Sequence, residues 1–234
     1  RRPDSPRSRS DGAHLRGEDG YQITRKDQSG MVLLPGGGVI KPPRSGFDAR
    51  LTLDVNIQGF VEEELDRGLD EFRSKSGAVV MMEPGTGDVL AIASRPHFNL
   101  NLRHNMSESA MHYAVQGLYE PGSTLKLISA AAALDLGLRG PETSMFCHNG
   151  YMRIPGGYVK DYKAFQNMTL EEVLAKSSNI GAYKIGLRVG TDRYMTYLRR
   201  FGFTRPTGII LPGEERGWTA DPGNGINFSR ITYG

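Results

Sequence analysis

The sequence predicts an α+β fold that combines one apolar β-hairpin with several helices. The hairpin is indicated by two apolar segments, 78–82 and 89–93, joined by a turn that contains Gly and Pro. Helices are indicated by an amphipathic stretch at 55–72 and by an alanine-rich stretch at 123–136. A helix, a hairpin and a helical lobe on one chain define an α+β architecture.

The first part of the chain carries weak structural signals. Residues 1–45 are rich in Gly, Pro, Ser and Arg and show β-like pieces only at 21–24 and 31–34. The arginines near the start favour a solvated, disordered linker over a nucleic-acid-binding arm. Residues 51–53 are a strand candidate. The helix at 55–72 is expected to bury one stripe, composed of Val55, Ile57, Phe60, Val61, Leu65, Leu69 and Phe72.

The later elements are predicted from caps and breaks. A long loop at 94–116 leads to the helix at 123–136, which stops at Gly137. Thr169 and Glu172 have the spacing of a capping box, so a short helix begins there. A second helix at 180–189 stops at Gly190, and a third, 191–201, has Thr191 as its cap and Gly202 as its stop. The end of the chain, from 208, is rich in Gly and Pro, with a short strand expected at 209–210.

Ser123 and Lys126 form the most informative motif of the sequence. Pro121 and Gly122 break the chain just before a strong helix former, so Ser123 is expected at a helix start. Lys126 falls one turn later on the same face. The apolar residues that follow would desolvate the lysine and favour its neutral, basic form. This pairing can activate a serine as a nucleophile without a histidine.

A second polar cluster, Ser177 to Asn179, lies at the predicted corner between two helices. Taken alone, such a cluster is an ordinary turn or cap. At a corner, however, the alternate side chains Ser177 and Asn179 can point into one cleft.

Composition restricts the class of protein. The 234 residues carry 29 basic and 26 acidic side chains, a net charge of +3 that does not favour nucleic acid as a partner. Cys147 is the only cysteine, so no internal disulfide can form, and a packed thiol is expected. The five histidines show no metal-ligand spacing, and we predict neither a metal nor a cofactor. No stretch approaches the ~20 apolar residues of a membrane span.

Together the two motifs resemble those of class B penicillin-binding proteins, the monofunctional transpeptidases of bacterial cell-wall synthesis. That family combines S-x-x-K, here 123–126, with S-x-N, here 177–179. Segment 77–91 looks like the first hairpin of the transpeptidase domain, and 207–214 is similar to a late loop signature. Segment 15–20 looks like the end of the N-terminal pedestal, and 48–58 looks like the entry to the transpeptidase domain.

The resemblance implies the penicillin-binding-protein or serine β-lactamase-like fold, an antiparallel sheet flanked by helices plus a helical lobe. It implies that residues 1–45 end the pedestal or linker region and that 46–234 belong to the transpeptidase domain. Ser123 would attack the D-Ala-D-Ala terminus of a stem peptide, and its backbone amide would supply half of an oxyanion hole. Lys126 would be the general base, Ser177 would pass a proton to the departing D-alanine, and Asn179 would orient Lys126 and the substrate amide.

The family's third motif, a Lys-Thr/Ser-Gly strand that follows S-x-N, does not occur after residue 179 of this sequence. We therefore expect a fold that is incomplete at its C-terminus and inactive as this polypeptide alone. Two other functions stay open: a superfamily hydrolase, either a β-lactamase or a D,D-carboxypeptidase, and a non-catalytic penicillin-binding scaffold or sensor. The pedestal-like segment opposes the hydrolase, and the missing motif supports the scaffold.

The resemblance also implies a location and partners. It implies the extracytoplasmic face of the bacterial inner membrane, with an N-terminal anchor helix that this sequence does not contain. Partners would be stem peptides, β-lactams as covalent inhibitors, and a membrane glycosyltransferase with division proteins. Segment 119–124 looks more like the division or sporulation branch than the elongation branch. The sequence leaves the stem-peptide chemistry open.

Overall fold

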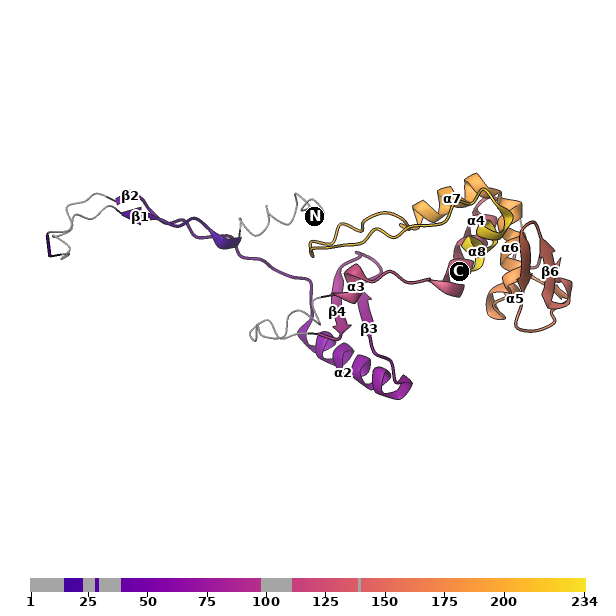
Figure 1. Ribbon diagram of the computed structural model, residues 1–234, viewed down its shortest axis with the longest axis horizontal. Coiled ribbons are helices and arrows are strands. Elements are labelled where there is room, and N and C mark those ends of the chain that lie inside the picture. The colour runs from indigo at the N-terminus through magenta and orange to yellow at the C-terminus, as the bar shows by residue number, and fades with distance from the viewer. Residues whose placement is uncertain (1–14, 23–27, 30–38, 98–110, 139) are drawn as a thin grey trace. The chain divides into compact units, whose positions relative to one another are not determined.

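The computed structural model describes residues 15–22, 28–29, 39–97, 111–138 and 140–234. The chain divides into two compact units, which we describe separately (Figure 1). The first unit comprises Arg1–Gln116 and Ile209–Glu214, and the second comprises Gly117–Gly208 and Glu215–Gly234.

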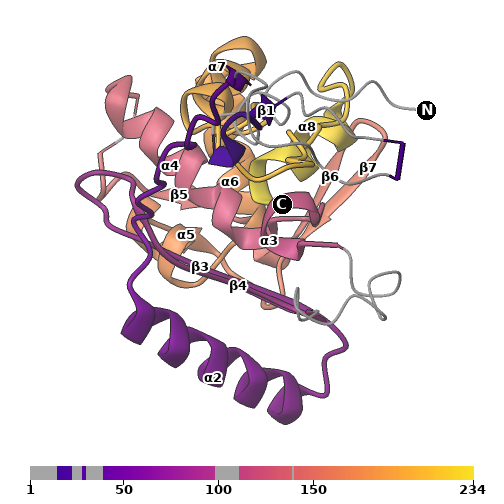
Figure 2. The ribbon, with the colours of Figure 1, turned by 90° about the vertical axis from the view of Figure 1, so that its left-hand side faces the viewer.

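The first unit contains one long helix beside a hairpin. Helix α2, Val55–Phe72, has the predicted bounds, because Asp54 caps it by accepting hydrogen bonds from the amides of Asn56 and Ile57. Strands β3, Gly77–Met82, and β4, Val89–Arg95, pair antiparallel, as the sequence predicts. Figure 2 shows α2 running along one face of this hairpin, which it contacts mainly through β4.

The core of the first unit is small. Val61 and Leu65 of α2 pack on Ala91 and Ala93 of β4, with partly buried side chains around them. The predicted stripe on α2 is therefore only partly buried, because Val55, Phe60 and Phe72 are exposed.

The strand predicted at 51–53 is wrong. These residues run beside the start of β4 and make single contacts instead of a ladder. The Thr52 hydroxyl donates to the carbonyl of Val89, and the amide of Asp54 donates to the carbonyl of Leu90. The chain turns into helix α2 at that point, which ends the pairing.

A short strand pair and a short helix also belong to the first unit. Strand β1, Tyr21–Gln22, pairs antiparallel with β2, Val39–Lys41, so the β-like signal at 21–24 is confirmed for its first two residues. Residues 23–24 and the predicted piece at 31–34 lie outside the described residues. The short helix α3, Tyr113–Gln116, ends the segment predicted as loop.

The second unit is a helical lobe with two short strand pairs. Its longer helices are α4, Lys126–Asp135; α6, Asn179–Val189; α7, Thr191–Arg200; and α8, Gly225–Tyr233. The shorter helical elements are two 3-10 turns, η2 at Gly122–Leu125 and η3 at His148–Gly150, and helix α5 at Leu170–Ala175. The strands are β5 at Met145–Phe146, β6 at Tyr151–Ile154, β7 at Gly157–Lys160 and β8 at Asn167–Met168. Strand β5 pairs with β8, and β6 pairs with β7.

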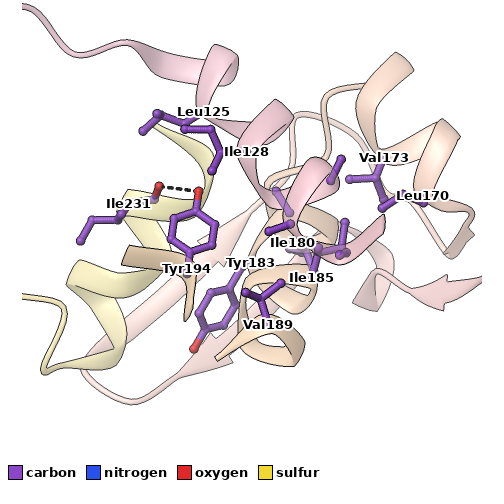
Figure 3. Packing of buried hydrophobic residues seen from close by; sticks show 14 of the residues in the cluster. Leu125, Ile128, Leu170, Val173, Ile180, Tyr183, Ile185, Val189, Tyr194 and Ile231 are labelled. Atoms are coloured by element: carbon purple, nitrogen blue, oxygen red, sulfur yellow. Dashed lines mark hydrogen bonds between the residues drawn. The ribbon is translucent and has the colours of Figure 1, made fainter. Parts of the chain in front are cut away.

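A single large core holds this lobe together. Helices α4 and α6 pack against each other at its centre, and α5, α7 and α8 add apolar side chains from around them (Figure 3). Tyr194 is fully buried and its hydroxyl donates to the carbonyl of Ile231 at 3.1 Å, the dashed line in Figure 3. A buried hydroxyl that finds such a partner avoids the cost of an unsatisfied polar group.

The predicted caps of α5 and α6 are confirmed, and that of α7 is wrong. Thr169 and Glu172 form the capping box of α5, and α6 ends at Val189, just before Gly190. The N-cap of α7 is Gly190 rather than Thr191. Gly190 has φ of 83°, a left-handed conformation that glycine adopts freely, so the chain reverses there and Thr191 is already helical.

The sequence analysis missed the β6–β7 hairpin and helix α8, and its strand at 209–210 is wrong. The hairpin turns at Pro155-Gly156, where Gly156 has φ of 84°. Helix α8 starts after Asn224, whose side chain accepts from the amide of Asn227 and overrides the Gly-rich composition of the segment. Residues 209–210 have irregular backbone.

Within the described ranges, none of the helices combines the length and the apolar character needed to cross a membrane.

Candidate active site

Ser123 lies in the 3-10 turn η2, immediately before α4. Pro121 precedes the turn, and Gly122 has φ of 59°, a conformation that suits glycine because it has no Cβ. Ser123 is exposed, whereas Leu125 points into the core. The predicted placement of Ser123 at a helix start is confirmed, with a first turn that is 3-10 rather than α.

The 3-10 turn brings Lys126 above Ser123. Side chains three residues apart eclipse each other in this geometry. The Nζ of Lys126 lies 3.1 Å from the Oγ of Ser123. Lys126 is only 3% exposed, so its amine approaches the serine from the buried side.

Ser177 completes a cluster of three polar side chains. Lys126 Nζ donates to the carbonyl of Ser177 at 2.7 Å and to its Oγ at 2.7 Å. The Oγ of Ser177 lies 3.0 Å from the Oγ of Ser123. The structure therefore joins Ser123, Lys126 and Ser177 in one hydrogen-bonded Ser–Lys–Ser cluster, which lies wholly within the second unit.

The backbone of Ser177 explains its double contact with Lys126. Ser177 has φ of 54°, a left-handed conformation that is uncommon for serine. The amide of Ser177 donates to Leu174 and that of Ser178 to Val173, so the turn is pinned to the end of α5. A non-glycine residue in this region costs about 1–3 kcal/mol and clusters at functional sites.

Burial changes the acid–base chemistry of Lys126. Desolvation lowers the pKa of its amine from 10.5 to about 8, although the nearby Asp161 carboxylate acts in the opposite direction. The sequence prediction of a desolvated lysine at this position is confirmed.

Asn179 lies beside the cluster. It is the first residue of α6, and its side-chain amide donates to the carbonyl of Lys160 at 2.9 Å. Within the described part of the chain, no hydrogen bond joins Asn179 to Lys126. The role expected for Asn179 in orienting Lys126 is thus not carried by a direct contact in this structure.

Sequence reasoning missed Asp161, which lies under the Ser177–Asn179 turn. Its carboxylate accepts from the Oγ of Ser178 at 2.8 Å and from the amides of Asn179 and Ile180 at 2.5 and 3.1 Å. The only signal in the sequence was an acidic residue after an alternating segment, which does not reveal a partner seventeen positions later.

Cys147 is fully buried, and its Sγ lies 3.7 Å from the Oγ of Ser178. Burial raises the pKa of this thiol, so it stays protonated near neutral pH. Among the residues that the structure describes, no three His, Cys, Asp or Glu side chains gather in a way that could hold a metal ion.

The helical lobe and its Ser–Lys–Ser cluster together define a class of protein. In this class, a serine at a helix start contacts a lysine three residues later in the sequence and a second serine at a helix–helix corner. The motif set S-x-x-K with S-x-N belongs to the penicillin-binding proteins and related β-lactamases.

Comparison with known families agrees with this class. The family model "Penicillin binding protein transpeptidase domain" matches residues 77–234. The chain belongs to this family, and its relatives are of class B. Solved structures show the same fold: Penicillin Binding Protein 2X from Streptococcus thermophilus superposes with a TM-score of 0.80 at 25% identity, over 97% of this chain and 34% of that one.

Curated relatives extend the match toward the N-terminus. Stage V sporulation protein D of Bacillus subtilis is 31% identical over 87% of this chain and 32% of its own length. Peptidoglycan D,D-transpeptidase FtsI of Escherichia coli is 30% identical over 94% of this chain and 37% of its own length. The chain thus spans about a third of the length of the curated relatives it matches.

Proposed function

We propose that this chain carries the acyl-transfer centre of a peptidoglycan D,D-transpeptidase, with Ser123 as its nucleophile. The observation that carries the proposal is the Ser–Lys–Ser cluster, in which a buried amine lies 3.1 Å from an exposed hydroxyl. Membership of the transpeptidase-domain family supports it, as do relatives that are themselves named peptidoglycan D,D-transpeptidases.

The first step is the attack of Ser123 on the carbonyl of the penultimate D-alanine of a stem peptide. The Oγ–carbonyl bond forms while the hydroxyl proton moves to Lys126 Nζ. With a pKa of about 8, about a tenth of the Lys126 amine is neutral at pH 7. An unperturbed lysine would offer only about one part in 3,000, so burial increases the population of the base by about 300-fold.

The second step is the loss of the terminal D-alanine. The carbon–nitrogen bond breaks, and Ser177 hands a proton to the departing amine while Lys126 replaces it. The 2.7 Å and 3.0 Å contacts of Ser177 Oγ with Lys126 and Ser123 support this relay. The ester on Ser123 is then attacked by the amine of a second stem peptide, which forms the crosslink and returns a proton to Ser123.

Two further groups are assigned to substrate binding. The backbone amide of Ser123 supplies half of an oxyanion hole for the tetrahedral intermediate. Asn179, at the edge of the cluster, binds the substrate amide. β-Lactams imitate the D-Ala-D-Ala amide and therefore acylate Ser123.

The proposal includes a setting in the cell. Peptidoglycan is the substrate that the relatives' names print, which supports a place in the cell envelope. We place the site on the extracytoplasmic face of the inner membrane, where stem peptides are exposed. A membrane glycosyltransferase and division proteins are the proposed partners.

Turnover of a natural substrate tests the function. The native protein is incubated with a stem pentapeptide ending in D-Ala-D-Ala and with an amine acceptor peptide. We expect release of free D-alanine and a crosslinked product, both abolished by Ser123→Ala and retained by the neighbouring Thr124→Ala. Crosslinking that persists in Ser123→Ala would refute the assignment.

The same experiment separates the alternatives. Release of D-alanine without crosslinking, or rapid turnover of a β-lactam, would identify a hydrolase. Binding of penicillin without any covalent product would identify a scaffold. The hydrogen-bonded Ser–Lys–Ser cluster favours the enzyme.

A further inference from the structure

A partly buried hydrogen-bond network joins the loop after strand β7 to the turn that carries Ser177. Asp161 accepts three hydrogen bonds from consecutive residues, Ser178, Asn179 and Ile180. Ser178 and Ile180 are fully buried, whereas Asp161 and Asn179 are partly buried, so the network is partly screened from water. Hydrogen bonds from neutral donors to a carboxylate are stronger than those between neutral groups, and burial strengthens them further.

The network acts directly on the strained residue of the site. Ser177 stands in the left-handed region with φ of 54°, and the three residues after it are the ones that Asp161 holds. Strained backbone persists only where its surroundings over-determine it. On the other side of Ser177, its own amide and that of Ser178 donate to carbonyls of α5.

We propose that Asp161 is a positioning residue of the acyl-transfer centre: its carboxylate clamps Ser178–Ile180 and so holds Ser177 with its carbonyl and hydroxyl both on Lys126. This inference rests on the proposed function and adds to it a residue outside the S-x-x-K and S-x-N motifs. Ser178, the middle residue of the second motif, becomes the side chain that ties the motif to the clamp.

Asp161 also bears electrostatically on Lys126, since its negative charge raises the pKa of that amine against the effect of burial. Charged side chains on the helices around α4 are engaged elsewhere: Lys176 with Glu172 on α5, Lys184 with the carbonyl of Phe146, and Arg200 with Asp135. The other charged residues of α5–α8 are exposed, namely Glu171, Arg188, Asp192, Arg193, Arg199 and Arg230. Removal of the Asp161 charge is therefore expected to lower the pKa of Lys126 further.

The test compares Asp161→Ala and Asp161→Asn with the parent in the native protein. The maximal acylation rate by a penicillin is expected to fall about 10²-fold in Asp161→Ala, the scale of a misplaced catalytic geometry. Asp161→Asn keeps one acceptor oxygen and is expected to lose less. In both variants the rising limb of the rate against pH moves to lower pH, which a purely structural defect would not produce.

Two additions keep the outcome decisive. Glu172→Gln is the matched control, because Glu172 is also a carboxylate at a helix start but does not touch the Ser177 turn. Should Asp161→Ala fail to fold, Asp161→Asn and Ser178→Ala replace it. Ser178→Ala removes the hydrogen bond to Asp161, together with the cap on the amide of Gly181, and keeps the charge. A lower rate with an unmoved pH limb is therefore expected.

A readout independent of acylation separates this inference from the proposed function. The pKa of Lys126 is followed through the 13Cε chemical shift of labelled lysine in parent and variants. A downward shift in Asp161→Asn supports the placement of the Asp161 carboxylate beside the cluster even if the parent is never acylated, an outcome that would refute only the function. Folded variants with the parent's Lys126 titration and the parent's acylation rate would overturn the proposal.

Discussion

The two units of this chain differ in how completely their helices are packed. In the first unit a single helix and a hairpin bury four apolar side chains, and Val80, Met81 and Met82 of β3 are 38–51% exposed. In the second unit α4 and α6 are surrounded by α5, α7 and α8, and a large cluster of buried apolar side chains joins all five helices. The Ser–Lys–Ser cluster belongs entirely to the second unit, which has the larger core.

The difference shows which part of the fold fixes the distances between the side chains of the candidate site. Ser123 and Ser177 are 54 positions apart, yet their hydroxyls lie 3.0 Å from each other. Helices that share a rigid core can hold such a geometry, whereas side chains on a thinly packed hairpin cannot. The predictions below test this contrast between the site-bearing unit and the first unit.

The largest expected effect is at Lys126. In the native protein, Lys126→Ala is expected to lower the rate of acylation by a penicillin about 10²–10⁴-fold, the usual scale for a positioned general base. Folding is expected to survive, because alanine is the better helix former. Stopped-flow acylation kinetics measure the loss. The control is Lys176→Ala, which removes an exposed lysine of the same unit, and equal rates in both variants would assign Lys126 a structural role.

Acylation is expected to depend on pH through the same amine. Because only neutral Lys126 accepts the proton of Ser123, the rate should rise about tenfold per pH unit below about 8 and level off above it. Rates measured with a penicillin between pH 6 and 9 provide the profile. A flat profile in a folded protein would contradict a lysine base.

The pH dependence of the free energy of unfolding tests independently whether the pKa of Lys126 is lowered. Since the folded-state pKa of Lys126 lies below its unfolded value of 10.5, the unfolded chain binds more protons between about pH 8 and 10.5. The contribution of Lys126 to the free energy of unfolding therefore rises with pH across that window. Denaturant unfolding of parent and Lys126→Ala at both ends of the window should show the difference growing in favour of the parent.

Core truncations should distinguish the two units. Ile180 is fully buried in the large core, so Ile180→Ala is expected to cost about 2–5 kcal/mol. Leu65→Ala, at the rim of the small cluster with 9% exposure, is expected to cost less, because its surroundings relax more easily. Native-state hydrogen exchange of amides in α6 and α2 reports each unit separately. Equal losses would mean that the two units are equally well packed.

The smallest effect is expected at a surface ion pair of the first unit. Arg95 donates to both carboxylate oxygens of Asp66, at 2.6 and 2.8 Å, which lowers the pKa of Asp66. A lowered carboxyl pKa stabilises the folded chain above the unfolded value near 3.8, and this contribution is lost as pH falls through the lowered pKa. Asp66→Asn should thus melt slightly lower at pH 7, with a gap that closes on acidification. A gap that persists in acid would show that packing of Arg95 matters more than its charge.

Local signals in the sequence predicted much of the fold. The bounds of α2 and the capping box of α5 follow from side chains within a few positions of each helix end. The hairpin of β3 and β4 follows from its two apolar runs. Helix α8 was not predicted, because its stabilising contacts come from distant elements. Thr232 lies against Gly186 of α6, and the carbonyl of Thr232 accepts from the hydroxyl of Ser129 of α4.

The sequence predicted which residues form the candidate site better than it predicted which of them touch each other. The helix start and the apolar run after it place Ser123 and Lys126, because the pair is local. The meeting with Ser177 depends on packing of α4 against α6 and was accessible only through the resemblance of the two motifs to a family. Asp161 was missed, because its hydrogen bonds cross between segments that no periodicity links.

The most direct test of the central claim is the position of the covalent adduct. The native protein is incubated with a penicillin, digested and mapped by mass spectrometry, with Ser123→Ala and Ser177→Ala as companions. We predict one adduct on Ser123 in the parent, none in Ser123→Ala, and a slowed but unmoved adduct in Ser177→Ala. An adduct on any other residue, or none in a folded parent, would contradict the account.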